Sequence, residues 1–229
     1  YIGVVLSTAE EMWGCKPKFD EYKKAMSTLK KLSVISPSDE RDRRISDEEF
    51  SQILAHSNTK LPLVDWTFFS LSTSMRVGEV SELLWSDLSS DGKSIIIRQR
   101  KHPKKKRDDK VPLLPIAQQI IARQTKEQSD RKVLIGKDKN KKWVKASELI
   151  FPQNPKSITT AFRRARQASG VEDVRYHDIR HEAISRLFEL GFDSMIVAVF
   201  SGHRDINMLR RYTHMNANKI LAMMAPKKA

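Results

Sequence analysis

Residues 176–212 read YHDIRHEAISRLFELGFDSMIVAVFSGHRDINMLRRY, and the interpretation of the whole chain starts from this stretch. It combines three kinds of side chain that suit a phosphodiester. Arginine offers a planar fork of donors for two phosphate oxygens, and histidine donates a hydrogen bond or moves a proton near neutral pH. Tyrosine carries a hydroxyl that can attack phosphorus and form a covalent ester. The candidates are His177, Arg180, the Gly202-His203 pair and Tyr212.

The spacing of these residues predicts how they are grouped. His177, Arg180 and His181 follow at i, i+3 and i+4, so we expect them on one face of a helix. A single histidine on a helix is more often a structural residue, and Tyr212 could be an ordinary half-buried aromatic. The clustering of two histidines with an arginine favours a site. Because no acidic cluster lies beside them, we expect a site without a metal ion or other cofactor.

Composition points towards a polyanionic partner. The chain has 229 residues, with 42 Lys and Arg against 28 Asp and Glu, which gives a formal charge of +14. Nucleic acid is the leading candidate, although charge can simply keep a protein soluble. The single cysteine, Cys15, excludes an internal disulfide and fits a reducing compartment. No signal peptide or membrane span is expected, and a start at Tyr1 suggests a fragment of a longer protein.

Local patterns predict a mainly α-helical fold with a small antiparallel β-sheet, an α+β class. Helices are expected at residues 1–13, 19–32, 46–54, 62–73, 76–88, 116–124, 157–169, 177–190 and 205–212. Residues 95–97 and 111–114 read as a hairpin with a basic tip, and residues 131–145 as a surface loop or a backbone-binding segment. The apolar run 195–200 is expected to be core. We expect a boundary between about Ser33 and Arg44.

Arg76 stands at the start of one predicted helix, next to Gly78 and Glu79. A cation there opposes the helix dipole, so an anionic partner is more natural than a purely structural role. A salt bridge to Glu79 or Glu82 is the alternative. The basic hairpin tip is equally open to two interpretations, since a run of charge is usually just solvated.

The motifs, in their order along the chain, resemble the catalytic domains of tyrosine recombinases (phage-type integrases). The phrases TSMRVGEVSELLWSDL, YHDIRHEAISRLF and FSGHRDINMLRRYTH are typical of that family, and the similarity runs from Arg44 to Met215. Each motif alone is weak, but their joint order is specific. The resemblance implies a remnant of the core-binding domain at residues 1–34, a linker at 35–44 and a catalytic domain with a tail helix at 45–229.

The resemblance also implies a role for each candidate residue. Arg76 matches the first catalytic arginine, His177 and Arg180 the H-x-x-R pair, His203 the G-H histidine and Tyr212 the nucleophile. Lys101 matches the hairpin lysine that acts as general acid, with Lys104 and Lys105 as substitutes, and Glu79 supports Arg76. The residues expected to contact the DNA backbone are Arg43, Arg44, Arg98, Arg100, Lys104, Lys105, Lys106, Arg163 and Arg211.

The implied function is site-specific recombination of double-stranded DNA through a 3′-phosphotyrosine, without metal or cofactor, for integration or excision of a mobile element. The implied assembly is a homotetramer on DNA through tail residues 215–229, with DNA-bending or directionality factors. The implied location is the bacterial cytoplasm, on the nucleoid. The alternatives are relaxation of DNA like a type IB topoisomerase, or a non-catalytic DNA-binding module.

Overall fold

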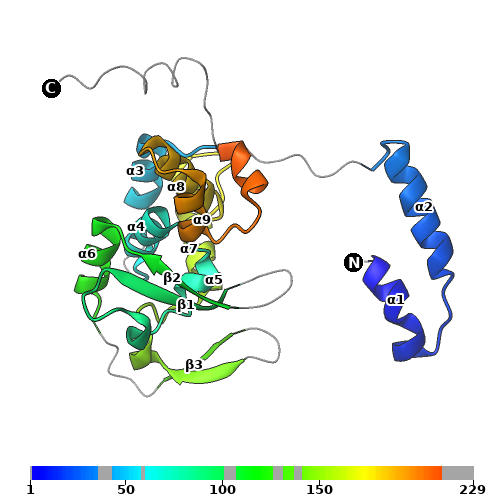
Figure 1. Cartoon of the computed structure of the whole chain (residues 1–229), viewed down its shortest axis with the longest axis horizontal. Helices are drawn as coiled ribbons and strands as arrows, with labels where there is room; N and C mark the ends of the chain where they lie inside the picture. Colours follow the sequence, from blue (N-terminus) through cyan, green and yellow to red (C-terminus); the bar gives the residue numbers. More distant parts are fainter. Residues whose placement is uncertain are drawn as a thin grey trace, which may run out of the picture. The chain divides into compact units, whose positions relative to one another are not determined.

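Figure 1 shows the computed structural model, which describes residues 2–35, 43–57, 60–100, 107–125, 131–136 and 141–212. The chain divides into two compact units, Tyr1–Arg41 and Asp42–Ala229. No helix in the described ranges is both long and apolar enough to cross a membrane.

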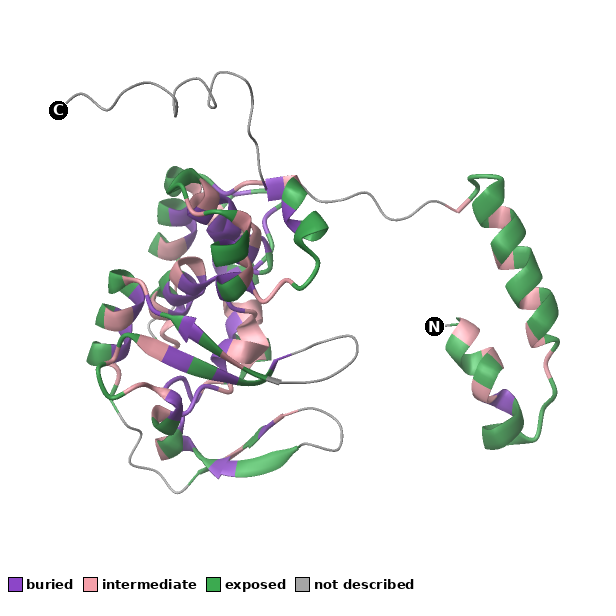
Figure 2. Ribbon diagram, viewed as in Figure 1, coloured by how far each residue is buried: buried purple, intermediate pink, exposed green. Residues whose placement is uncertain are grey.

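The first unit consists of α1 (Ile2–Trp13) and α2 (Phe19–Lys31), as the apolar spacing predicted. The two helices touch at Gly3, where a Cβ atom would lie 3.3 Å from the ring of Tyr22. Among the described residues of this unit only Ala9 is buried, and large apolar side chains such as Met12 and Trp13 are exposed. Two helices of this kind have almost no core of their own (Figure 2).

The second unit is mainly helical with two small antiparallel hairpins, which confirms the predicted fold class. Its helices are α3 (Asp47–Ala55), α4 (Leu63–Thr73), α5 (Val77–Val80), α6 (Pro115–Arg123), α7 (Pro155–Ser169), α8 (Asp178–Glu189) and α9 (Ser194–Ser201). Short 3-10 helices are η1 (Trp85–Asp87), η3 (Ala146–Glu148) and η4 (Ile206–Tyr212). Strands β1 (Ser94–Arg100) and β2 (Arg107–Pro112) form one hairpin, and β3 (Lys132–Ile135) and β4 (Lys142–Lys145) form the other.

The core of this unit is built around α4, which packs against α6, α7 and α8. Trp66 and Phe69 of α4 are fully buried and meet the ring of Phe151 at centroid distances of 5.4 and 4.8 Å. Phe162 of α7 meets Tyr176 edge to face at 5.4 Å. Figure 2 shows that the buried residues lie on the inner faces of these helices. This core fixes α8, which starts directly after His177 and carries Arg180.

Several local signals act as predicted. The hydroxyl of Ser46 accepts a hydrogen bond from the Glu49 N–H at 3.2 Å, and the Glu49 carboxylate accepts one from the Ser46 N–H at 3.1 Å. This reciprocal capping starts α3. Gly191 follows α8 with a φ of +87°, a conformation that glycine adopts without strain.

Three expectations were wrong. The helix expected at residues 76–88 stops after Val80, because Leu84 leaves it to bridge Leu149. Of the two alternatives for residues 131–145, the surface loop is wrong where residues 132–135 pair with 142–145 as strands β3 and β4. The apolar run in α9 is only half core, since Met195 is 65% and Val199 48% exposed.

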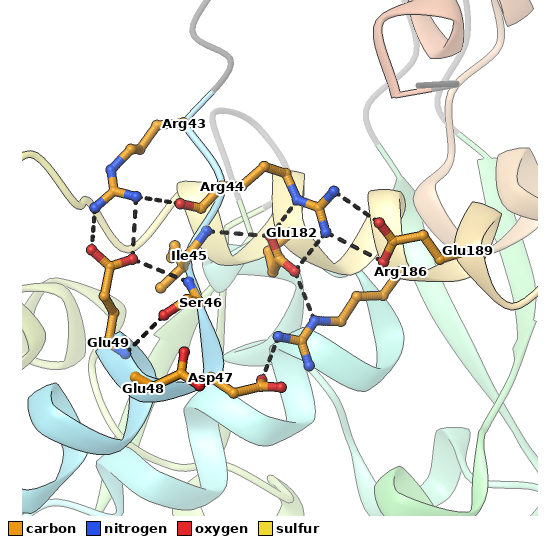
Figure 3. Close-up of a pocket in the computed structure, with 10 residues that line it drawn as sticks. All are labelled: Arg43, Arg44, Ile45, Ser46, Asp47, Glu48, Glu49, Glu182, Arg186 and Glu189. Carbon is orange, nitrogen blue, oxygen red and sulfur yellow. Dashed lines mark hydrogen bonds and ion pairs between the residues drawn. The ribbon is translucent and has the colours of Figure 1, made fainter. Parts of the chain in front are cut away.

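Ion pairs anchor residues 43–49 to the outer face of α8 (Figure 3). The carboxylate of Glu182, on a side chain only 3% exposed, accepts hydrogen bonds from Arg44 Nε at 2.6 Å and Arg186 Nε at 2.8 Å. The backbone N–H of Ile45 donates to it as well, at 3.3 Å. Burial raises the pKa of Glu182, but the bonds from Arg44 and Arg186 outweigh burial and hold that pKa below its usual value.

Replacing Glu182 with Gln removes the shared charge and should lower the free energy of unfolding by about 3 kcal/mol, as loss of one partner in a buried pair does. Glu189→Gln is the matched control, because Glu189 lies on the same helix, also pairs with Arg44 and is 44% exposed. It should cost less than about 1 kcal/mol. Urea denaturation measures both values, and equal small losses would contradict a buried anchor at Glu182.

Candidate active site

A β-bulge in β1 turns Arg100 into the protein. Ile97 pairs with Asp109 and Arg100 with Arg107, so three steps along β1 match two along β2. The extra residue reverses the alternation of the strand. Gln99 takes a φ of +48° at the bulge, and its N–H donates to the Asp108 carboxylate at 2.8 Å. As a result Arg100 is only 2% exposed.

Two buried arginines bind the carbonyl end of α9. The last carbonyl groups of a helix have no partner within it, and cations are favourable there. Arg100 donates from Nη1 to the Val199 oxygen at 3.2 Å and from Nη2 to the Phe200 oxygen at 2.7 Å. Arg180 donates from Nη2 to the Ser201 oxygen at 2.6 Å. The end of α9 therefore brings β1 and α8 to one point.

The glycine of the Gly-His pair follows from this packing. Gly202 has a φ of +69°, and a Cβ atom on it would lie 2.4 Å from Nε of Arg100. Any larger side chain would therefore strain the backbone and displace the arginine. The next residue, His203, is held by a hydrogen-bond contact of 2.9 Å between its Nδ1 and the Ser201 hydroxyl.

Glu79 joins Arg76 to the same cluster. Its carboxylate accepts hydrogen bonds from the Arg76 backbone at 3.0 Å and from Arg76 Nη1 at 2.7 Å. Arg100 donates to it from Nε at 3.3 Å and from Nη2 at 3.4 Å. Burial raises the pKa of Glu79, but the charges of Arg100, Arg76 and Arg180 outweigh burial and hold that pKa below its usual value. The salt bridge considered as an alternative role for Arg76 is thus present.

Arg180 lies at the centre of the positive charge. It is 5% exposed and donates to the carbonyls of Ser74 and Ser201, which use two of its five N–H donors. Burial and the charge of Arg76 lower the pKa of Arg180 to about 9, so it is a cation at pH 7. Glu79 supplies one negative charge against the guanidinium groups of Arg76, Arg100 and Arg180. The excess positive charge favours an anion.

Tyr212, at the end of η4, comes to the histidines of α8. Its side chain is buried, and the hydroxyl lies 2.7 Å from Nδ1 of His181. The ring of His181 stacks on the tyrosine at a centroid distance of 5.6 Å, and the ring of His203 lies at 6.3 Å. His177 is exposed and meets His181 edge to face at 5.1 Å. Tyr212, His181 and His203 therefore form one group.

The pKa values of His181 and His203 both lie well below the ordinary value of a histidine. Desolvation and the neighbouring His177 and Arg211 lower the pKa of His181 to about 4. Desolvation and the charges of Arg180 and Arg76 lower the pKa of His203 to about 4. At neutral pH His181 is uncharged, so its Nδ1 can accept the hydrogen bond of the tyrosine hydroxyl.

His181 is the residue to which the sequence assigned no role. The signal was present, because its i+4 spacing from His177 placed it on the polar face of the helix. The spacing could not predict the contact with Tyr212, because that contact depends on how η4 packs against α8 after the chain leaves α9.

The residues predicted to contact DNA lie in different surroundings. Arg43 pairs with Glu49, and Arg98, whose side chain is 45% exposed, pairs with Asp87. Arg163 is exposed on α7, and Arg211 lies 3.4 Å from Nδ1 of His181.

The structure differs from the expectation at Arg100, which is buried because the bulge reverses the direction of its side chain. Arg44, whose side chain is 35% exposed, pairs with Glu182 and Glu189 of α8. The predicted general acid Lys101, its substitutes Lys104 and Lys105, Lys106 and tail residues 215–229 lie outside the described residues.

Comparison with known proteins agrees with this arrangement of elements. The model of the phage integrase family matches residues 43–219. The chain belongs to the phage integrase family. It is 31% identical over 186 residues to the shufflon-specific DNA recombinase of Escherichia coli, across 80% of this chain and 43% of that protein. It is 24% identical to the integrase of Salmonella phage P22, across 96% of this chain and 53% of that one. The chain therefore spans about half the length of these relatives.

Solved structures share the fold of this integrase-family chain. The integrase of transposon Tn1549, in complex with a circular intermediate DNA, superposes with a TM-score of 0.62 at 18% identity, covering 84% of this chain and 68% of that one. A lambda integrase dimer bound to a core site gives a TM-score of 0.56 at 18% identity, covering 82% and 70%.

The two histidine pKa values predict how stability depends on pH. Because the folded-state values lie near 4 and the ordinary value is 6.5, the unfolded chain binds more protons between these limits. The free energy of unfolding should therefore fall as pH decreases from 6.5 towards 4.5. Urea denaturation across this range should show the loss, and His181→Asn with His203→Asn should flatten it. A pH-independent stability would contradict neutral histidines in the folded protein.

Proposed function

We propose that the protein cleaves and rejoins DNA strands at specific sites, with Tyr212 as the nucleophile and a 3′-phosphotyrosine as the intermediate. The observation that carries the proposal is the position of the Tyr212 hydroxyl, which contacts His181 beside a cluster of guanidinium groups with excess positive charge. This combination suits attack on a phosphodiester, because it places a nucleophile next to donors for the oxygens that gain charge.

Each residue of the cluster takes one task in the proposed reaction. As the tyrosine oxygen attacks phosphorus, the nonbridging oxygens gain negative charge, and fixed donors there stabilise the transition state more than the ground state. Arg180, with donors left over from its two carbonyl bonds, and Arg76 bind these oxygens. His203 and the exposed His177 add donors. Glu79 supports Arg76.

Proton transfer accompanies the attack and the departure of the leaving group. Tyrosine has an ordinary pKa near 10, so its proton must leave as the new bond to phosphorus forms. His181 is placed to accept it, because its Nδ1 lies 2.7 Å from the hydroxyl. Its pKa of about 4 disfavours the charged form in the free protein, and the negative charge of a bound phosphodiester would favour that form. The 5′-oxygen leaves with a proton from Lys101, the role that the family resemblance gives this lysine. One phosphodiester replaces another, so the reaction consumes no nucleotide.

Double-stranded DNA is the proposed partner. The charge of +14 suits it, and the related integrases of Tn1549 and lambda are known in complex with DNA. The first unit is proposed to be the end of a core-binding domain, and its exposed apolar side chains support packing within a larger domain. We further propose that the protein assembles as a homotetramer on DNA through tail residues 215–229, with accessory DNA-bending factors. Its proposed role is the integration or excision of a mobile element.

A nicked duplex that traps the covalent adduct tests the nucleophile. Tyr212→Phe should abolish the adduct while DNA binding persists, because only the attacking oxygen is lost. Tyr176→Phe is the matched control, since Tyr176 is also buried in this unit but bonds Ser70 and the Trp66 carbonyl. It should still form the adduct. An adduct that survives Tyr212→Phe would show that Tyr212 is not the nucleophile.

A second assay separates a recombinase from a topoisomerase. A recombinase exchanges strands between two specific sites, whereas a topoisomerase relaxes any supercoiled plasmid.

Loss of the Arg180 side chain should slow the chemical step. Arg180→Ala should reduce the cleavage rate at saturating DNA by roughly 10²- to 10³-fold, as loss of a preorganised donor does. Arg163→Ala, on the exposed face of α7, should leave that rate unchanged. It should instead weaken binding and reduce the slope of log affinity against log salt by about 0.9. Equal effects of the two variants on the rate would place the phosphate clamp elsewhere.

A further inference from the structure

Arg100 is the arginine whose surroundings differ most from the sequence expectation. It stands at the end of β1, directly before the basic hairpin tip, where a surface contact with DNA was predicted. Instead its side chain is 1% exposed, and all three of its nitrogen atoms donate within the protein. Arg100 therefore uses four of its five N–H donors within the protein, whereas Arg180 uses two and keeps three for a ligand.

Burial of a guanidinium group is unfavourable unless charge and hydrogen bonds compensate it. Here the compensation comes from two distant segments, the carboxylate of Glu79 and the carbonyls of Val199 and Phe200. The bulge with its positive φ at Gln99 and the absence of a Cβ atom at Gly202 both make room for this side chain. Arg98, two residues earlier, has a side chain that is 45% exposed and pairs with the buried carboxylate of Asp87. The local geometry is thus specific to Arg100.

We propose that Arg100 is a positioning residue for strand cleavage, which orients Arg76 through Glu79 and His203 through the end of α9 without touching DNA. This inference rests on the proposed function.

The path to Arg76 runs through a shared carboxylate. Glu79 Oε1 accepts from Arg76 at 2.7 Å and from Arg100 at 3.3 Å, and Oε2 accepts from the Arg76 backbone and from Arg100. The carboxylate is therefore held from both sides. Without Arg100 it could rotate, and the guanidinium of Arg76 would follow it.

The path to His203 runs through the end of α9. Arg100 binds the carbonyls of Val199 and Phe200, which lie four and three residues before His203. It also fills the space beside Gly202, the residue that turns the chain towards His203. Loss of this side chain would leave two helix-end carbonyls without their donors and a gap next to the turn.

The test compares Arg100→Met with Arg123→Met, the same chemical change at an arginine of α6 whose side chain is 56% exposed and pairs with Asp65. Single-turnover cleavage of a nicked duplex at saturating DNA, DNA affinity and thermal stability are measured for each. Arg100→Met should slow cleavage by about 10²-fold, the effect of a small misplacement of reacting groups, with affinity changed less than about threefold. Arg123→Met should leave the rate at saturating DNA unchanged, because Arg123 lies outside the candidate site. Assays run at a fixed interval below each Tm remove the effect of partial unfolding.

Two further variants separate positioning from general stability. Arg100→Lys keeps the charge at the helix end and should recover about tenfold of the lost rate. In the double variant with Glu79→Gln, the losses should not add, because both changes release the same Arg76 side chain. Additive losses would indicate separate structural effects and would overturn the proposal.

The outcomes also distinguish this inference from the proposed function. If the unaltered protein forms no covalent adduct, the proposed function fails. If it forms the adduct and Arg100→Met cleaves at the same rate, the positioning role fails alone. A rate retained at saturation together with much weaker binding would return Arg100 to a direct DNA contact. If Arg100→Met does not fold, the comparison of Arg100→Lys with Arg123→Lys decides, and equal rates in that pair overturn the proposal.

Discussion

The carbonyl end of α9 is the interaction on which the rest of this site depends. Its last carbonyls receive donors from Arg100 and Arg180, which come from a strand and a helix far apart in the sequence. Arg180 reaches from there to the Ser74 carbonyl beside Arg76. One helix end thus fixes the positions of two guanidinium groups that would otherwise repel each other. The positive charge that remains uncompensated is what a phosphate would neutralise.

Helix α8 is held from both sides, which explains how it keeps Arg180 in place. On its outer face Glu182 is buried between Arg44 and Arg186, and the chain entering this unit is fixed there (Figure 3). On its inner face Arg180 binds two carbonyls, and His181 contacts Tyr212. The residues of the two faces are consecutive in the sequence: Arg180 and His181 lie on the inner face and Glu182 on the outer face. Any rotation of the helix would therefore break ion pairs and the candidate site together.

Much of this could be predicted from sequence, because the signals are local. The capping box at Ser46, the contact between His177 and His181 and the turn at Gly191 each depend on a few neighbouring residues. The set of candidate residues came from motif order and from the resemblance to tyrosine recombinases. Of this set, Arg76, Glu79 and Arg180 lie in one cluster, and Tyr212 reaches it through the histidines.

The remainder depends on contacts between distant segments. The alternation of SIIIRQR directs Arg100 outward, and only pairing with β2 creates the bulge that reverses it. Helix α5 ends early because Leu84 bridges Leu149. Met195 and Val199 of α9 are exposed because they lie on the face of that helix that points away from the core. The contact between His181 and Tyr212 is likewise absent from any local pattern, because the two lie 31 positions apart.

A structure of the protein with a nicked DNA duplex and vanadate, which mimics the five-coordinate phosphorus, tests the central claim most directly. The account predicts vanadium bonded to the Tyr212 oxygen, with Arg76, Arg180 and His203 on its equatorial oxygens. Arg180 should still donate to the carbonyls of Ser74 and Ser201, and Arg100 should stay buried against α9. Vanadium bound away from Tyr212, or an Arg180 released from both carbonyls, would contradict the account.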